Sequence, residues 1–96
     1  MKRQVLVLGC AKRDLARLGE FLSVKSPRAA NRAAAAISDA VLSLAELAER
    51  GHPDPEGRFR EVAVHFGRDG YVIQYLVEPK RVLVARIFHS LEDRAP

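Results

Sequence analysis

The chain has 96 residues, 48% of them hydrophobic and 29% charged, with a formal net charge of +4. These values predict one globular domain, residues 1–96, and exclude a disordered chain. The apolar runs are too short to cross a bilayer, and residues 5–8 are too few for the core of a signal peptide. The single cysteine, Cys10, has no partner for an internal disulfide, which agrees with a reducing compartment. We therefore expect a cytoplasmic protein without a membrane segment.

The basic side chains are concentrated in the first third of the chain. From Gly51 onward, basic and acidic residues balance. Such an excess suits an acidic partner, either a nucleic acid or an acidic protein segment, and it also fits a solvated helical face. The basic residues of the first third are Lys2, Arg3, Lys12, Arg13, Arg17, Lys25, Arg28 and Arg32.

The chain begins with a predicted strand and helix. Residues 4–8 form an apolar run that ends at Gly9, which indicates a strand buried on both faces. Residues 11–23 then predict an amphipathic helix, because leucines recur at helical spacing and charged residues lie between them. The leucines of this stripe are Leu15, Leu18 and Leu22.

A second helix follows at once. Ser26 suits its N-cap and Pro27 its first position, and we expect it to run to Arg50, where Gly51 stops it. One apolar stripe with steps of three and four residues indicates its buried face. The members of this stripe are Ala30, Ala34, Ile37, Val41, Leu44 and Ala48.

The second half of the chain predicts three strands. Residues 58–65, 71–77 and 81–89 alternate or are rich in β-branched and aromatic side chains, and residues 52–57 are expected to form a loop. An Asp-Gly pair within residues 67–70 favours the positive φ angles of a tight hairpin turn. Three strands with short connections predict an antiparallel meander.

The predicted fold class is therefore α+β, with the order β-α-α-β-β-β. The helical hairpin must bury its apolar stripes, and one face of the antiparallel sheet is the available partner. The other face, or the rim of the sheet, is left for function. The residues that we expect in the core are Ile37, Val41, Leu44, Ile73 and Val84.

Motifs for common cofactor chemistry are missing from the sequence. It has no Gly-rich phosphate loop and no Gly-x-Ser-x-Gly nucleophile elbow. His52, His65 and His89 are not spaced with a cysteine or carboxylate in the manner of a metal site. We therefore expect neither a metal nor a cofactor.

The remaining candidates for function are basic and aromatic residues of the predicted strands and turns. Alternation places Arg86 on the same face as Val82 and Val84, and His89 on the opposite face. An arginine within an apolar strand needs a partner, so Arg86 pairs with a carboxylate such as Glu61 or with backbone carbonyls, or it faces an anionic group of another molecule. The full set is Arg58, Arg60, Arg68, Tyr71, Tyr75, Arg86 and His89.

Three segments resemble the strands of the RelE/ParE superfamily of small bacterial toxins. They are Arg-Glu-Val-Ala-Val-His at 60–65, Gly-Tyr-Val-Ile-Gln-Tyr-Leu-Val at 70–77 and Val-Leu-Val-Ala-Arg-Ile-Phe-His-Ser at 82–90. Members of the family typically carry an arginine at the start of the second strand, a tyrosine-rich third strand and a histidine near the end of the fourth. The upstream helical hairpin agrees, so the resemblance covers nearly the whole chain.

The resemblance implies one of two activities. RelE-like members cut messenger RNA on the ribosome with clustered Lys and Arg and a C-terminal Tyr or His, whereas ParE-like members lack that set and inhibit DNA gyrase. The second and third strands of this chain hold no lysine, and Glu92 and Asp93 would repel an RNA backbone beside His89. The balance favours a ParE-like gyrase inhibitor that is not an enzyme. The alternative is a ribosome-dependent endoribonuclease that uses Arg58, Arg86 and His89.

The resemblance also implies a cognate antitoxin of the ParD or RelB kind. The C-terminal segment of such a partner is disordered when free and wraps the toxin as a helix and an extended stretch. We expect it to dock on the basic first helix and in a groove beside the helical hairpin. The residues expected to contact the antitoxin or the target are Arg13, Arg17, Arg58, Arg60, Arg68, Tyr75, Arg86 and His89.

Overall fold

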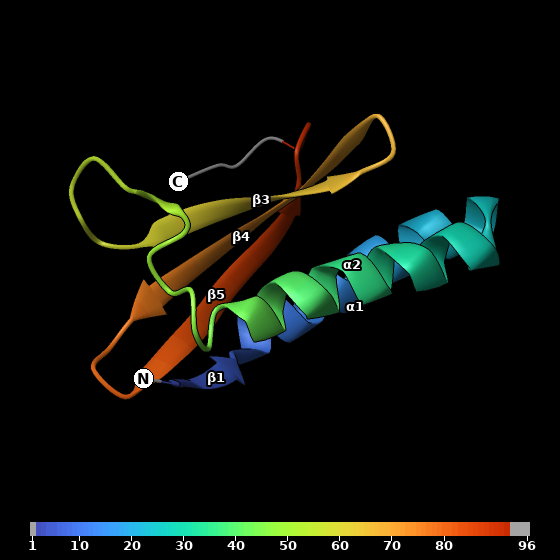
Figure 1. Ribbon diagram of the computed structural model, residues 1–96. Helices are drawn as coiled ribbons and strands as arrows, with labels where there is room; N and C mark the ends of the chain where they lie inside the picture. Colours follow the sequence, from blue (N-terminus) through green and yellow to red (C-terminus); the bar gives the residue numbers. More distant parts are fainter. Residues whose placement is uncertain (1, 93–96) are drawn as a thin grey trace.

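The computed structural model describes residues 2–92 and confirms the α+β fold with its helical hairpin on one face of a sheet (Figure 1). A short strand, β2, is added within the segment that was expected to be a loop. No helix among the described residues is long and apolar enough to cross a membrane. In chain order, the elements are β1 (Gln4–Val7), α1 (Gly9–Lys25), α2 (Pro27–Ser43), β2 (His52–Pro53), β3 (Arg60–Phe66), β4 (Asp69–Val77) and β5 (Arg81–His89).

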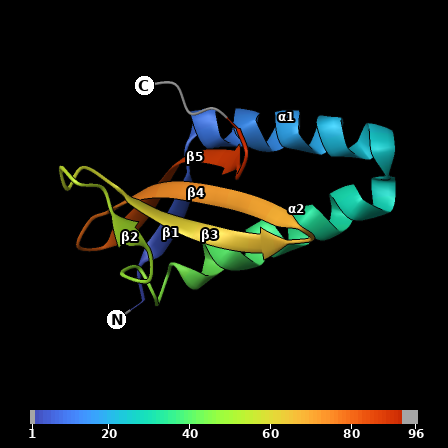
Figure 2. The ribbon, with the colours of Figure 1, turned by 90° about the horizontal axis from the view of Figure 1, so that it is seen from above.

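The strands form one five-stranded sheet in the order β1-β5-β4-β3-β2. β3, β4 and β5 make the predicted antiparallel meander, and β1 adds to β5 in parallel, so the sheet is mixed. Figure 2 shows α1 and α2 side by side, joined by a short connection at the end that lies away from the sheet. Because β1 is a four-residue edge strand, its side chains are exposed or only half-buried. The expectation that residues 4–8 are buried on both faces is therefore wrong.

The core lies between the helical hairpin and one face of β3, β4 and β5. Ile37 and Val41 of α2 are buried, and Leu44 just after it is fully buried. Ile73 of β4 and Val84 of β5 are also fully buried, which confirms the predicted core. The alanines of α2 allow this helix to lie close to the sheet, because small side chains fill little space between two packed elements.

The second helix ends earlier than the sequence predicted. Its N-terminus is as expected, with the Ser26 hydroxyl accepting from the amide of Ala29 at 3.1 Å. Regular α-helix stops at Ser43, however, and tight turns lead on to Gly51. The Tyr75 hydroxyl donates to the Ala48 carbonyl at 2.8 Å, so a side chain of the sheet satisfies a backbone group of this turn segment. The stripe prediction holds for Leu44 and Ala48, which are buried without being helical. It is wrong for Ala34, which is exposed, whereas the neighbouring Ala33 is buried.

The β3–β4 connection is a two-residue turn made by Gly67 and Arg68, closed by the pair of Phe66 with Asp69. Gly67 has φ +62°, the left-handed value that the first central residue of this kind of hairpin turn requires. The turn lies within the predicted residues 67–70, but the glycine that opens it precedes the Asp-Gly pair. As a result, Arg68 stands at the tip of the hairpin.

Large-to-small changes in the core test this packing. We expect Ile37→Ala and Leu44→Ala each to lower the free energy of unfolding by about 2–5 kcal/mol, because each leaves a cavity beneath the sheet. Leu42→Ala is the matched control, because Leu42 is 66% exposed on the same helix, and its change should stay within about 0.5 kcal/mol. Urea unfolding of the three variants gives these values. Losses below about 0.5 kcal/mol at both core positions would show that the hairpin packs differently.

Candidate functional site

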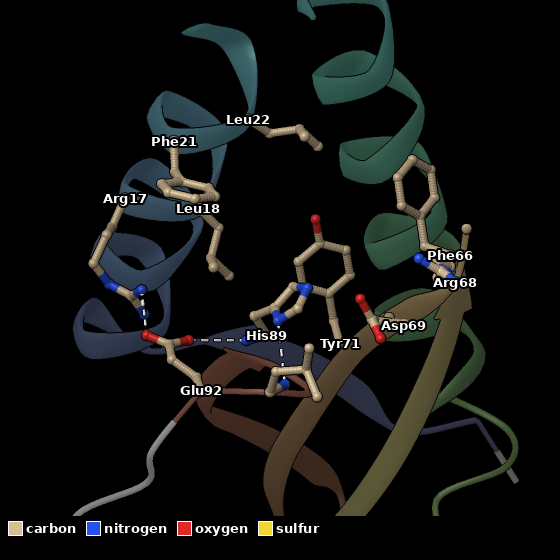
Figure 3. A pocket seen from close by; sticks show the side chains of 13 residues that line it. Arg17, Leu18, Phe21, Leu22, Phe66, Arg68, Asp69, Tyr71, His89 and Glu92 are labelled. Carbon is tan, nitrogen blue, oxygen red and sulfur yellow. Dashed lines mark hydrogen bonds and ion pairs between the residues drawn. The ribbon is translucent and has the colours of Figure 1, made fainter. Parts of the chain in front are cut away.

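A cavity of about 640 Å³ opens between α1, the tip of the β3–β4 hairpin and the end of β5 (Figure 3). We call it the helix–hairpin groove. Its volume is within the usual range of ligand pockets, and its walls are mostly apolar. The apolar wall is made by Leu18, Phe21 and Leu22 of α1, Phe66 and Tyr71 of the hairpin, and Leu91 after β5.

Polar groups stand at the rim of this groove. Arg17 and Glu92 form an ion pair, and Arg68 and Asp69 lie across the opening on the hairpin. Arg68 has no hydrogen-bond or ion-pair partner among the described residues. Burial raises the pKa of Tyr71, so its hydroxyl stays protonated near neutral pH and can donate. The groove therefore offers an apolar floor with hydrogen-bond donors at its edge.

His89 forms one end of the groove. Its ring meets the ring of Tyr71 edge-on, with the ring centres 5.6 Å apart. The Nδ1 atom accepts a hydrogen bond from the Leu91 amide at 3.2 Å, which places the hydrogen of the neutral ring on Nε2. His89 thus presents an N–H donor beside the groove.

The orientation of His89 corrects the prediction from alternation. In the register of β4 and β5, Tyr75 lies opposite Val84 and Gln74 opposite Arg86, so Ala85 is an extra residue in a β-bulge. Such an insertion reverses which side chains face the core. His89 therefore lies on the helix-covered face with Val84, and Arg86 lies on the other face. The two residues do remain on opposite faces, as predicted.

Arg86 is held by Asp14 of α1, a residue that sequence reasoning missed. The Asp14 carboxylate accepts from Arg86 Nε at 2.8 Å and Nη2 at 3.1 Å, and from the backbone amide of Ile87 at 2.9 Å. That Arg86 pairs with a carboxylate is confirmed, but the predicted partner, Glu61, instead accepts from Gln74 Nε2 at 2.7 Å. The available signal was a carboxylate inside the apolar stripe of the first helix, four residues before Leu18.

Asp14 satisfies an edge of the sheet that would otherwise be unpaired. β1 ends at Val7, opposite Val84, and beyond that point no strand formed by residues 2–92 neighbours β5 on this side. Burial alone would raise the pKa of Asp14, but the hydrogen bonds from Arg86 and the Ile87 amide outweigh burial and hold the pKa below its usual 3.8. The carboxylate is therefore charged at neutral pH although its side chain is only 6% exposed.

Three other candidates lie at the opposite end of the sheet. Arg58 pairs with Asp54 at 3.0 Å in the loop before β3. Arg60 donates to the Gly51 carbonyl at 2.7 Å. Tyr75 is fully buried, where burial raises its pKa, and its hydroxyl accepts from the Gly51 amide at 3.0 Å. Arg60 and Tyr75 thus hold the turn segment that follows α2 against the sheet, whereas Arg58 pairs within its own loop.

Apart from Arg13 and Arg86, the predicted site residues thus separate into two groups. Tyr75 marks one group and Tyr71, which lies opposite His89 in the sheet, marks the other. The two tyrosines are four residues apart along β4, so their Cα atoms are separated by about 13 Å. The groove brings together Arg17, Arg68 and His89 and excludes Arg58 and Arg60. Arg13 lies in the first turns of α1, where its guanidinium contacts the Cys10 sulfur at 3.2 Å. Within residues 2–92, no group of His, Cys, Asp and Glu is arranged to hold a metal.

Comparison with known proteins identifies the class. A family model for the ParE toxin of the type II toxin-antitoxin system parDE matches residues 6–94. Two toxins of Caulobacter vibrioides are similar along nearly their whole lengths. Toxin RelE3 is 43% identical over 84 residues, covering 88% of this chain and 90% of the relative. Toxin RelE1 is 41% identical over 90 residues, covering 94% and 96%.

The fold has a close counterpart among solved structures. A chain of the chromosomal ParDE TA system from P. aeruginosa matches with a TM-score of 0.78 and 21% identity, covering 92% of this chain and 96% of that one. At that identity, the match supports the fold alone. Taken with the family model and the relatives, this chain belongs to the ParE toxin family of type II toxin–antitoxin systems, within the RelE/ParE superfamily. Membership implies a cognate antitoxin as partner.

The Asp14 contact makes a testable contribution to stability. A carboxyl group whose pKa is lowered by folding stabilises the fold above its unfolded pKa and loses that contribution as pH falls through its folded pKa. We expect Asp14→Asn to cost about 1–3 kcal/mol of unfolding free energy at pH 7, a value discounted because Arg86 is partly exposed. The difference from the wild type should shrink as pH falls below 3.8.

Asp39→Asn is the control for this prediction, since Asp39 is an exposed carboxylate on α2, and it should change the free energy by less than about 0.5 kcal/mol. Urea unfolding at pH 7, 5 and 3 supplies the comparison. A deficit in Asp14→Asn that is the same at pH 3 as at pH 7 would contradict the assigned role of the charged carboxylate.

Proposed function

We propose that this toxin arrests bacterial growth by binding and inhibiting DNA gyrase in the cytoplasm, and that its antitoxin neutralises it. The observation that carries this proposal is the separation of the residues that a ribonuclease would need. Cleavage of RNA by its own 2′-hydroxyl requires a base, an acid and cations around a single phosphate. Arg58 and His89 lie at opposite ends of the sheet, and Arg86 lies on the face opposite to His89.

The arginines named for that reaction are also engaged within the fold. The Asp14 carboxylate accepts hydrogen bonds from two nitrogens of the Arg86 guanidinium. Arg58 forms ion pairs with Asp54 and Glu56. Each pair compensates a positive charge that would otherwise face a phosphate. This arrangement supports a protein that acts through its binding surface and not through chemistry.

The antitoxin is proposed to bind α1 and the helix–hairpin groove. Phe21 and Val24 of α1 are 66% and 87% exposed, and Phe21 continues the apolar wall of the groove, so the exposed apolar surface is larger than a single side chain. Residues 1–32 hold eight basic and two acidic side chains, whereas residues 33–96 hold eight and ten. The net positive charge therefore belongs to the first third of the chain, which includes α1 with Phe21 and the groove residue Arg17. Such a surface suits an acidic, amphipathic segment.

A ribosome-dependent endoribonuclease is the second candidate. Two observations favour it: the curated relatives bear the name RelE, and His89 stands in the groove near Tyr71 and Arg68. These groups offer a histidine, a phenolic hydroxyl and a free guanidinium within one cavity. If this reaction occurs, His89 and Arg68 would carry it, in place of the set with Arg58.

The test is a pair of assays on the purified protein. We expect inhibition of supercoiling by DNA gyrase and no cleavage of messenger RNA in translating ribosomes. His89→Ala separates the two candidates, with His65→Ala as control because His65 is exposed on β3 and outside the groove. Ribosome-dependent cleavage that is abolished by His89→Ala but not by His65→Ala, with supercoiling unaffected, would establish the second candidate in place of the first.

A further inference from the structure

Two carboxylates cover the edge of β5 where β1 has ended. The Ile87 amide donates to Asp14 at 2.9 Å, and the His89 amide donates to Glu92 Oε1 at 2.9 Å. Arg17 joins the two, with Nη2 facing Asp14 at 3.4 Å and Nη1 bonded to Glu92. The Ile87 and His89 amides of this edge are thus satisfied by side chains in place of a strand.

The two carboxylates are held very differently. The Asp14 side chain is 6% exposed and lies inside the packing of α1 against β5, whereas the Glu92 side chain is 31% exposed in the turn that follows β5. The Arg17 side chain is 46% exposed. Because solvated ion pairs contribute little to stability, the Arg17–Glu92 pair can break at small cost while Glu92 Oε1 keeps the hydrogen bond from the His89 amide. Asp14 cannot leave without exposing the Ile87 amide and the Arg86 guanidinium.

The Arg17–Glu92 pair stands at the mouth of the helix–hairpin groove. Figure 3 shows it beside Phe21 and Leu18, on the same wall of the cavity. A helix seated on Phe21 would therefore bring its polar edge against Arg17, one turn earlier on α1. An acidic side chain on that edge would find the guanidinium already paired with a carboxylate of the toxin itself.

We propose that Glu92 occupies, in the free toxin, the place that a carboxylate of the antitoxin takes in the complex. The turn after β5 then acts as an internal competitor that lowers the affinity for the antitoxin, and antitoxin binding transfers Arg17 from Glu92 to the partner. This inference rests on the proposed binding of the antitoxin at the groove. It does not depend on gyrase as the target.

Removing the charge of Glu92 tests the competition. The probe is the purified cognate antitoxin that membership of this class implies, titrated into the full-length toxin by calorimetry. We expect Glu92→Gln to tighten binding about two- to fivefold, the range that an exposed ion pair supplies. Glu78→Gln is the matched control, since Glu78 pairs with Arg81 at a comparable exposure of 41% but lies outside the groove, and it should leave the affinity unchanged.

A second pair of variants tests the groove itself. Phe21 and Leu42 are both 66% exposed, but only Phe21 lines the groove. We expect Phe21→Glu to weaken binding at least about tenfold, as loss of a buried anchor does, and Leu42→Glu to change it less than about twofold. Thermal melting checks that both variants fold.

The outcomes separate this inference from the proposed function. Unchanged or weaker binding by Glu92→Gln would overturn the competition. Equal effects of Phe21→Glu and Leu42→Glu would overturn the groove as the docking site. Neither result bears on the supercoiling assay, which contains no antitoxin, and a negative supercoiling assay would leave the calorimetric result standing.

Discussion

The contact of Asp14 with β5 is the interaction on which the arrangement of this domain depends. Unpaired amides at a sheet edge can pair with another chain. Because β1 is short, the part of β5 beyond Val84 has no strand within residues 2–92 to pair its amides on the β1 side. Asp14 satisfies the Ile87 amide and the Arg86 guanidinium together, and so it fixes α1 against the strand that β1 no longer covers. Since α1 forms one wall of the helix–hairpin groove, the carboxylate that closes the edge also determines where the groove opens.

The two ends of the sheet have different roles as a result. At the end near β2, Arg60 and Tyr75 bond to backbone groups of the turn segment after α2, and Arg58 pairs within its own loop. At the groove end, Arg68 is free of partners among residues 2–92, and Phe21 is largely exposed. The polar groups of the first end stabilise the fold, whereas the unfilled surface of the second is available to another molecule. Family membership supplies the expected occupant, an antitoxin.

Local patterns in the sequence predicted the elements and the core well. Apolar spacing located both helices, and the buried positions of Ile37 and Ile73 followed from periodicity alone. Ser26 as N-cap was also recognisable, because capping depends on a few neighbouring residues. The family resemblance, which rests on the order of strand segments, was confirmed by the comparisons.

The features that the sequence concealed depend on long-range pairing. The partner of Arg86 lies 72 positions away in the chain. The place of Asp14 in the apolar stripe of the first helix indicates a buried carboxylate, but it does not show which strand residue this carboxylate binds. The bulge at Ala85 reversed the predicted facing of His89, because alternation alone cannot show an inserted residue. The turn segment after α2 likewise involves a distant partner, the Tyr75 hydroxyl, which reaches the Ala48 carbonyl from β4. The site is therefore less predictable than the fold, since it is built where distant segments meet.

The central claim is that the toxin is controlled through the helix–hairpin groove and the adjoining face of α1. Amide hydrogen exchange of the toxin, with and without its antitoxin, tests this claim most directly because it maps the covered surface without any substitution. The account predicts slower exchange in the second half of α1 and in the β3–β4 turn around Arg68 when the antitoxin is bound. Slowing confined to the loop around Arg58 and to β2, with α1 and the turn unchanged, would contradict it.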